Sequence, residues 1–179
     1  MTDLRTQLAC RQAQPDDAAA IARIYNEGIA DRIATFETRP RTLAEIREWF
    51  DGRHPIVVVS NDADEIVGFA ATSTYRPRDA YAGVAEFSVY VARDARGGGA
   101  GRTAMLGLIE AAEAAGFWKL VSRVFVDNEP SRRLLAAVGF REIGTYRRHA
   151  QLEGRWLDVV IVEGLLGEAA EATLDDAHA

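Results

Sequence analysis

The fold of this protein is decided by the stretch Ser88-Val-Tyr-Val-Ala-Arg-Asp-Ala-Arg96-Gly97-Gly98-Gly99-Ala100-Gly101-Arg102. Its pattern indicates a strand, a glycine-rich turn and the start of a helix. Glycines let the backbone approach a ligand closely, and a helix start adds unpaired N–H groups and the positive end of a dipole. With Arg96 and Arg102 as added charge, the stretch predicts a cradle for an anionic group. A bare glycine cluster is equally compatible with a flexible surface turn.

Two well-known phosphate-binding loops do not match this turn. A P-loop needs a Lys-Ser/Thr pair after its last glycine, whereas this chain has Arg102-Thr103. A dinucleotide-binding fingerprint has the spacing G-x-G-x-x-G at the first strand of the domain. That spacing does not occur here, and the turn lies in the middle of the chain.

The segments around the turn alternate between strand and helix patterns. The expected elements are a strand over Leu4–Arg11, a helix opened by Pro15-Asp16-Asp17, a loop over 30–41, a short helix capped by Thr42 and Glu45, a hairpin of strands after Pro55 and from Ile66, a strand over 84–91, a helix over Thr103–Ala115, a strand over 120–126, a short helix over 131–138, and final strands over Glu142–Gln151 and Arg155–Leu165. This order predicts one mixed α/β domain over residues 1–167. Residues 168–179 are acidic and rich in alanine, and we expect a disordered tail there.

Composition excludes several classes of protein. The 179 residues suit one domain with a sizeable core. No apolar run approaches the ~20 residues that a membrane span needs, and the first ten residues lack the apolar stretch of a secretory signal. Cys10 is the single cysteine, and the three histidines are scattered, so we expect no internal disulfide and no metal site. These features predict a soluble, cytoplasmic protein with no membrane partner.

The placement of charge is more informative than the net charge of -6. Four of the 27 acidic residues lie in the last twelve positions, which leaves 23 acidic against 21 basic residues, a net charge of -2, in residues 1–167. No basic surface interleaved with aromatic residues is evident, so a nucleic-acid partner is disfavoured. Arginines at 76, 78, 96 and 102 instead lie in loops near the turn. They predict a small anionic ligand.

The turn resembles a signature of the GNAT superfamily of N-acetyltransferases, Arg-x-x-Gly-x-Gly/Ala, which appears here as Arg96-Gly-Gly-Gly99-Ala-Gly101. A second element of that superfamily, Asn128-Glu-Pro-Ser131 followed by a short helix and Val138-Gly139-Phe140, stands at the expected distance. Four further segments resemble the phosphinothricin N-acetyltransferase branch, which includes enzymes that acetylate methionine sulfoximine and arsinothricin. They are Phe36-Glu-Thr-Arg-Pro, Tyr75-Arg76-Pro-Arg78-Asp-Ala-Tyr81, Glu86-Phe-Ser-Val-Tyr-Val91 and Gly154-Arg-Trp-Leu-Asp158. The resemblance covers about residues 5–166.

The resemblance implies a fold and a cosubstrate. The fold is a single domain with a central mixed, mostly antiparallel sheet, splayed at the acetyl-CoA strand and flanked by helices. Acetyl-CoA would place its pyrophosphate on the amides of Gly97 to Arg102. Its pantetheine arm would pair with the backbone of Val89, Tyr90 and Val91, and Asn128 and Ser131 would contact the far side of that arm. No metal is implied.

The resemblance also implies an acceptor site. Alternation places Glu86 on one face of its strand with Ser88 and Tyr90. A carboxylate there can act as the base that removes a proton from the substrate ammonium, and the family has its proposed base at this position. The alternative is that Glu86 is an ordinary surface glutamate. The family's Arg-x-Arg stretch implies that Arg76 and Arg78 hold the anionic groups of the substrate, although loop arginines are often merely solvated. Phe36, Tyr75 and Tyr81 are candidate pocket walls or core residues.

One position departs from the family pattern. Many relatives carry Tyr or His in the helix after the Asn-x-x-Ser element, where it can protonate the departing thiolate, and this chain has Leu135. Tyr90 or Tyr146 could serve instead, or the thiolate could leave unprotonated, since a free thiol has a pKa near ~8.5. The acid is therefore left open.

Together, these features predict direct transfer of an acetyl group to the primary amine of a small amino-acid-like substrate in a ternary complex. The substrate would be of the phosphinothricin, methionine sulfoximine or arsinothricin type, with detoxification as a candidate role, and a homodimer is expected. Two alternatives remain: acetylation of protein or peptide N-termini, and a non-catalytic acyl-CoA sensor.

Overall fold

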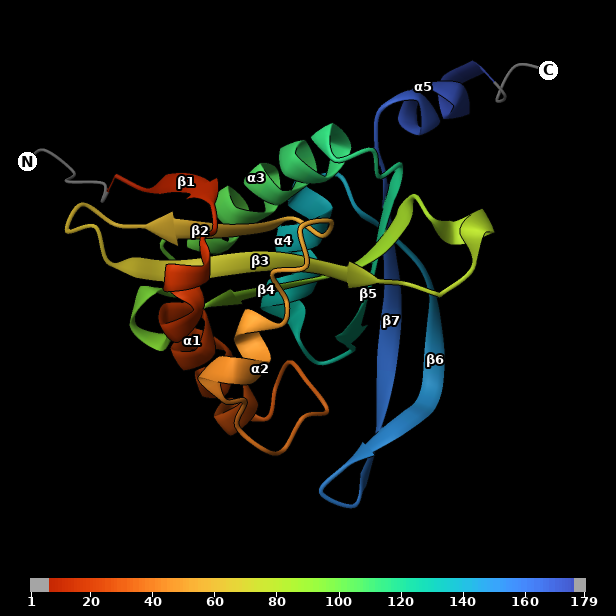
Figure 1. Ribbon diagram of the computed structural model, residues 1–179. Helices are drawn as coiled ribbons and strands as arrows, with labels where there is room; N and C mark the ends of the chain where they lie inside the picture. Colours follow the sequence, from red (N-terminus) through yellow and green to blue (C-terminus); the bar gives the residue numbers. More distant parts are fainter. Residues whose placement is uncertain (1–6, 176–179) are drawn as a thin grey trace, which may run out of the picture.

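The computed structural model describes residues 7–175 and contains one seven-stranded sheet with helices on both faces (Figure 1). The strand order is β1-β2-β3-β4-β5-β7-β6. The strands are β1 (Ala9–Gln12), β2 (Ile56–Ser60), β3 (Ile66–Thr74), β4 (Val84–Val91), β5 (Lys119–Phe125), β6 (Arg141–Leu152) and β7 (Arg155–Leu165). The helices are α1 (Ala18–Asp31), α2 (Leu43–Arg47), α3 (Ala100–Ala114), α4 (Glu129–Ala137) and α5 (Glu168–Asp175). None of these helices is long and apolar enough to cross a membrane.

A hydrophobic core lies on each face of the sheet. Helix α1 packs against β3 and β4 with a cluster that includes Ile21, Ile24 and Phe69. Helix α3 covers the opposite face, where Met105 and Leu108 are fully buried. The alternation predicted for β4 is confirmed, since Phe87, Val89 and Val91 pack on the α3 side while Tyr90 packs on the α1 side.

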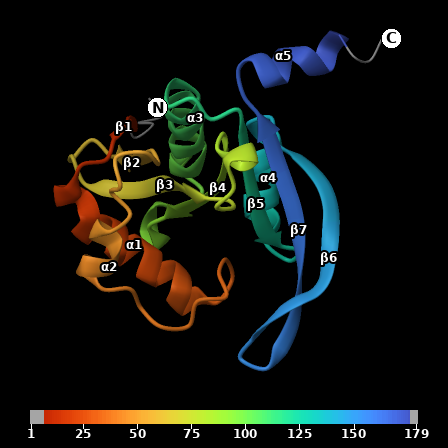
Figure 2. The same cartoon turned by 45° about the vertical axis from the view of Figure 1, so that its right-hand side comes forward.

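The sheet is split between β4 and β5, its only parallel pair among the described strands. These two strands pair only where Val84–Glu86 lie beside Lys119–Val121. Beyond that point β4 stays with β3 as far as Val91, whereas β5 follows β7 as far as Phe125. Figure 2 shows β5, β7 and β6 turned away from the rest of the sheet. The expected mixed, mostly antiparallel sheet with a splayed strand is thereby confirmed.

The structure differs from the sequence predictions at three element boundaries. The first strand begins at Ala9, and residues 4–6 of the predicted strand lie outside the described part. Helix α3 begins at Ala100 instead of Thr103, because Gly99 with φ 92° supplies the left-handed turn that precedes it. The tail expected to be disordered forms helix α5 as far as Asp175, since alanine and glutamate are strong helix formers. Residues 176–179 lie outside the described part.

Strand β6 carries an irregularity that shapes the site. Its pairing with β7 shifts between Tyr146 and Ala150. Arg148 adopts a left-handed conformation with φ 49°, and its backbone N–H donates to the Asp158 carboxylate at 2.7 Å. A bulge of this kind re-aims the neighbouring side chains. Here it brings His149 to the wall of a cavity beside Glu86.

Candidate active site

Two cavities meet where the sheet splits. The first, which we call the split cavity, has a volume of about 710 Å³ and lies between β4 and β5. Its walls are residues 87–91 of β4, the glycine-rich turn, residues 122–124 of β5 and one side of α4. Every residue predicted to bind the cosubstrate lines it except Gly98 and Ala100.

The glycine-rich turn lines the split cavity and leads into the start of α3. Gly97 and Gly99 have φ values of 78° and 92°, which a residue with a Cβ rarely adopts. A Cβ at Gly101 would lie 3.0 Å from Leu134 Cδ2, so the helix start is close-packed there. The first backbone bond of α3 runs from the Thr103 N–H to the Gly99 carbonyl. The three preceding N–H groups therefore have no helical partner and can receive an anion.

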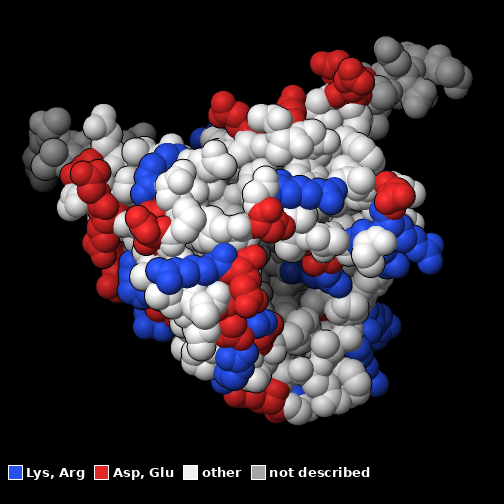
Figure 3. All heavy atoms as spheres, in the orientation of Figure 1, with Lys and Arg blue, Asp and Glu red and all other residues white. Residues whose placement is uncertain are grey.

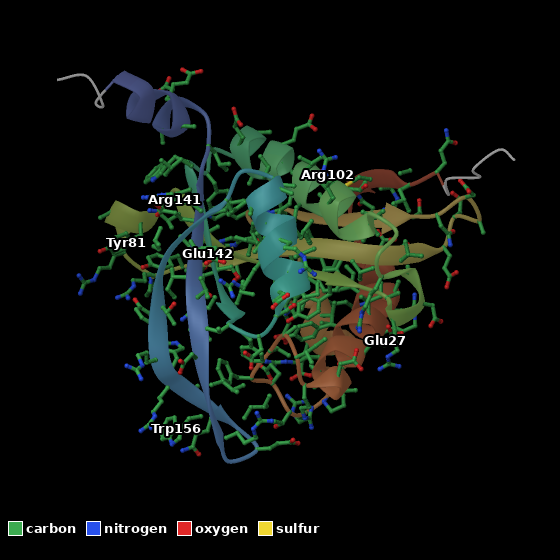
Figure 4. The ribbon with its side chains drawn as sticks, turned by 180° about the vertical axis from the view of Figure 1, so that it is seen from behind. Glu27, Tyr81, Arg102, Arg141, Glu142 and Trp156 are labelled. Carbon is green, nitrogen blue, oxygen red and sulfur yellow. The ribbon has the colours of Figure 1, made fainter. Side chains whose placement is uncertain are left out.

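The two arginines of the turn play different parts. Arg96 is bound to Asp31, with 2.7 Å between Arg96 Nη2 and Asp31 Oδ2, and its Nε donates to the Val91 carbonyl. Arg93 joins the same carboxylate, and the two arginines hold the pKa of Asp31 below its usual value. Arg102 lines the split cavity and has no carboxylate partner among the side chains of residues 7–171. Figure 4 labels it at the start of α3. Arg102 is thus the available cation of the turn.

Helix α4 supplies the far wall. Asn128 Oδ1 accepts a hydrogen bond from the Ser131 N–H at 3.3 Å and caps the helix, while its Nδ2 donates to the Ile33 carbonyl. Both Asn128 and Ser131 line the split cavity. Leu135, also on this wall, is 1% exposed and belongs to the hydrophobic core. No proton can come from that position.

Glu86 lines a second cavity of about 620 Å³ beside the β6–β7 hairpin, which we call the hairpin cavity and which adjoins the split cavity at Ser122 and Arg123. Its Oε1 accepts a hydrogen bond from Arg123 Nη2 of β5 in an ion pair. Glu86 lines the hairpin cavity, and Arg123 and Ser122 line both cavities. Sequence reasoning missed Arg123, although a charged residue within the apolar run Leu-Val-Ser-Arg-Val-Phe-Val was a signal that could have found it.

The other walls of the hairpin cavity come from distant segments. Phe36 packs edge-on against Phe125, with ring centroids 4.8 Å apart, and His149 comes from the bulge in β6. Arg39 and Glu37 come from the connection between α1 and α2. Figure 3 shows this face hollowed between that connection and the hairpin, with atoms of both charges at the hollow.

Four residues predicted to hold the substrate lie elsewhere. Arg76 and Arg78 line a separate cavity with His54 and Tyr81, on the connection between β3 and β4. The ring of Tyr75 packs edge-on against the ring of Tyr81, with centroids 5.7 Å apart. The guanidinium carbon of Arg76 lies 5.3 Å from the centroid of the Tyr75 ring. In Figure 4, Tyr81 lies at the left edge of the view, well away from Arg102 on α3. Of the five predicted acceptor residues, the structure places Phe36 in the same cavity as Glu86 and the others outside it.

The two tyrosines named as candidate acids differ in environment. Tyr90 lines the split cavity, but its ring lies among Tyr25 and Phe69 on the α1 side of the sheet. Burial raises the pKa of its hydroxyl well above the usual value, so that group stays protonated. Tyr146 is 54% exposed and lines neither the split cavity nor the hairpin cavity. The geometry gives Tyr146 no access to a leaving thiolate.

Comparisons with known proteins match this arrangement. A model of the acetyltransferase (GNAT) family matches residues 21–140. The chain is 35% identical over 157 residues to an L-methionine sulfoximine/L-methionine sulfone acetyltransferase from Pseudomonas aeruginosa (86% of this chain, 91% of that protein). It is 34% identical over 163 residues to a phosphinothricin N-acetyltransferase from Streptomyces coelicolor (88% and 95%).

Among solved structures, similarity extends over almost the whole domain. A GNAT superfamily phosphinothricin acetyltransferase from Sinorhizobium meliloti, in complex with acetyl-CoA, superposes with a TM-score of 0.84 at 30% identity, covering 94% of this chain and 92% of that one. The resemblance inferred from the sequence motifs is therefore confirmed. By sequence and by fold, the chain belongs to the acetyltransferase (GNAT) family.

Proposed function

We propose that this protein transfers the acetyl group of acetyl-CoA to the primary amine of a small, anionic, amino-acid-like substrate by direct attack in a ternary complex. One observation carries the proposal: the split cavity and the hairpin cavity share Ser122 and Arg123, and Arg123 is paired with Glu86 of the hairpin cavity. A thioester lying in the first and an amine lying in the second would come together there, as direct transfer requires. The names of the relatives, which act on phosphinothricin and methionine sulfoximine, support the substrate class.

The split cavity suits acetyl-CoA. The free N–H groups at the start of α3 and the unpaired charge of Arg102 would bind the pyrophosphate. No strand of the described part pairs with the β5-facing edge of residues 87–91, which leaves that edge open to an extended ligand. The pantetheine arm would pair with Val89, Tyr90 and Val91 there, and Asn128 and Ser131 would contact it from α4.

Glu86 would supply the base. The substrate ammonium loses a proton to the Glu86 carboxylate, directly or through one water, and the amine lone pair attacks the thioester carbonyl carbon. The C–N bond forms, the attacking nitrogen gives its second proton to the solvent, the C–S bond breaks and the thiolate leaves. Main-chain N–H groups of β4 would stabilise the oxyanion. Because a free thiol has a pKa near ~8.5, the thiolate can depart and take its proton from water, which fits the absence of a donor at Leu135.

Thiol release measures the reaction directly. The wild-type protein is incubated with acetyl-CoA and, in turn, phosphinothricin, methionine sulfoximine, methionine sulfone, arsinothricin, or a short peptide with a free N-terminus. We expect fast release with at least one of the four amino-acid analogues and slow release with the peptide. Release with the peptide alone would favour an N-terminal acetyltransferase. Acetyl-CoA binding without release in any reaction would favour a sensor.

Other expectations stand beside this proposal. The homodimer and a role in detoxification stay predictions that follow from the resemblance, and the cytoplasmic location stays a prediction that follows from the composition. The roles of Arg76, Arg78, Tyr75 and Tyr81 also stay predictions, and they would require the β3–β4 connection to approach Glu86 when the substrate binds.

A further inference from the structure

Most charged groups in the hairpin cavity already have partners that keep them in place. Arg39 donates to both carboxylate oxygens of Glu45, at 2.6 and 3.2 Å. Arg41 donates to Glu37 at 2.6 Å. These pairs belong to the connection between α1 and α2 and build the cavity wall. Glu86 and Arg123, in contrast, form a charged pair that faces the cavity and still has unused hydrogen-bonding capacity.

The Glu86–Arg123 ion pair uses one atom of each partner. Arg123 Nη2 contacts Glu86 Oε1, and neither side chain has another hydrogen bond within residues 7–171. Glu86 Oε2 and the remaining guanidinium donors of Arg123 are therefore available to a ligand. Both side chains are partly open, with exposed fractions of 31% for Glu86 and 43% for Arg123.

We propose that this ion pair is the recognition site for the head group of an α-amino acid, with Glu86 taking the ammonium and Arg123 taking the α-carboxylate. The inference deepens the proposed function and rests on it, since it names the substrate class of the same site. In an α-amino acid, the two charged groups are attached to one carbon atom. A carboxylate beside a guanidinium is their complement, and the guanidinium fork matches carboxylate geometry.

The position of Arg123 agrees with the chemistry. Arg123 lines both cavities, so a carboxylate held by it would keep the α-amine at the junction, beside Glu86 and next to the thioester. The acceptor side chain would then extend toward Phe36 and His149 in the hairpin cavity. Arg76 and Arg78 line another cavity and, in this arrangement, are not placed to hold that carboxylate.

Arg123 can hold the α-carboxylate of the substrate while Glu86 accepts a proton from the ammonium. A guanidinium stays protonated throughout the accessible pH range, so Arg123 would hold the carboxylate whether or not Glu86 carries the substrate proton. Removal of that proton turns the ammonium into the nucleophile while the carboxylate stays anchored. Arg123 thus sets specificity and orientation, and Glu86 accepts the proton.

The test compares an acceptor with its own α-carboxamide. Methionine sulfoximine and methionine sulfoximine α-amide are assayed by thiol release with the wild-type protein, Arg123→Gln and Arg123→Lys. We expect the wild-type kcat/KM to favour the free acid by about 30- to 100-fold, as expected for a charge-assisted hydrogen-bonded pair. In Arg123→Gln that preference should fall to within about threefold, mainly through KM, and Arg123→Lys should recover part of it.

Controls separate a specificity role from a structural one. Arg133→Gln removes an arginine from a largely exposed pair with Glu129 on α4 and should leave the preference unchanged. Acetyl-CoA affinity, measured by calorimetry, should be the same in Arg123→Gln and wild type. If Arg123→Gln lowers kcat/KM equally for acid and amide, Arg123 acts only through Glu86 and the proposal is wrong.

A binding measurement distinguishes this proposal from the proposed function. Calorimetry with the CoA-loaded wild-type protein should show methionine sulfoximine binding at least about 30-fold more tightly than its amide. If the acid binds selectively but no thiol is released, the proposed function fails and the head-group site stands. If acid and amide bind equally, or neither binds, the head-group site is refuted, whatever the turnover.

Discussion

The split cavity and the hairpin cavity are built from different kinds of chemical group. The split cavity is lined by the glycine-rich turn, by the edge of β4 and by apolar side chains with a few arginines, and most of its lining comes from two continuous stretches, residues 87–102 and 122–135. The hairpin cavity is built from side chains on four separate segments: residues 34–39, β4, β5 and the bulge in β6. Acetyl-CoA would be bound mainly by backbone groups in the split cavity, whereas the amine substrate would be bound by individual side chains in the hairpin cavity.

This difference predicts which substitutions impair ligand binding in each of the two cavities. A site formed by backbone N–H groups should tolerate many side-chain changes but not an added Cβ that blocks the approach of the ligand. A site formed by side chains should lose its function with a single functional group while the fold is retained. Substitutions that affect only one half would support the comparison, and substitutions that affect both equally would contradict it.

The largest effect is expected from Gly101→Glu. The new side chain would collide with Leu134 Cδ2, which lies 3.0 Å from the position of its Cβ, and would bring negative charge to the anion site. We expect acetyl-CoA affinity, measured by calorimetry, to fall by at least about 1,000-fold, since the new side chain crowds the helix start and its carboxylate repels the pyrophosphate. Gly144→Glu is the matched control, because a Cβ at Gly144 meets nothing within 4 Å. Normal affinity in Gly101→Glu would refute the cradle.

The next effect is expected from Glu86→Gln. The amide keeps the shape of the side chain but cannot accept the substrate proton, so kcat should fall by about 10²- to 10³-fold. Acetyl-CoA affinity should stay within about twofold of wild type, because Glu86 belongs to the hairpin cavity. Rates of both proteins are followed across the accessible pH range. A wild-type kcat/KM that does not change with pH would contradict the role of Glu86 as base.

Much of the split cavity could be predicted from the sequence because its signals are local. The glycine cluster, the alternation of β4 and the Asn128–Ser131 element each lie within a few residues of chain, and each occupies the predicted wall. The capping box of Thr42 and Glu45 is confirmed for the same reason, since its two hydrogen bonds join residues three apart. Local hydrogen bonding and periodicity determine such features.

The hairpin cavity could not be predicted to the same degree because its partners are distant in sequence. Glu86 and Arg123 meet only because Glu86 lies opposite Val121 in the parallel register, and then β4 and β5 diverge. His149 reaches the cavity through a bulge that depends on Asp158 of the next strand. Register and bulges follow from the packing of the whole sheet, and no single segment encodes them.

The smallest effect concerns Glu45, which accepts hydrogen bonds from Arg39 in the wall of the hairpin cavity. Hydrogen bonds from the Arg39 guanidinium and from the Thr42 backbone N–H lower the pKa of Glu45 from 4.5 to about 2. Because the folded pKa lies below the unfolded one, Glu45 stabilises the fold fully above about pH 4.5. That stabilisation is lost as the pH falls toward 2, where the carboxylate becomes protonated in the folded state too.

Glu45→Gln should therefore lower the Tm at pH 7 by roughly 1–3 °C, as expected for a largely solvated pair in a domain of this size, and should leave it unchanged near pH 2. The decline of Tm between pH 4.5 and 2 should be shallower than in wild type. Glu129→Gln, which breaks the exposed pair with Arg133, should not change that decline. Acetyl-CoA affinity should match wild type in both variants, since neither residue lines the split cavity. A loss of acetyl-CoA affinity in Glu45→Gln would show that the two halves are coupled through the wall, and would contradict the separation between backbone and side-chain recognition.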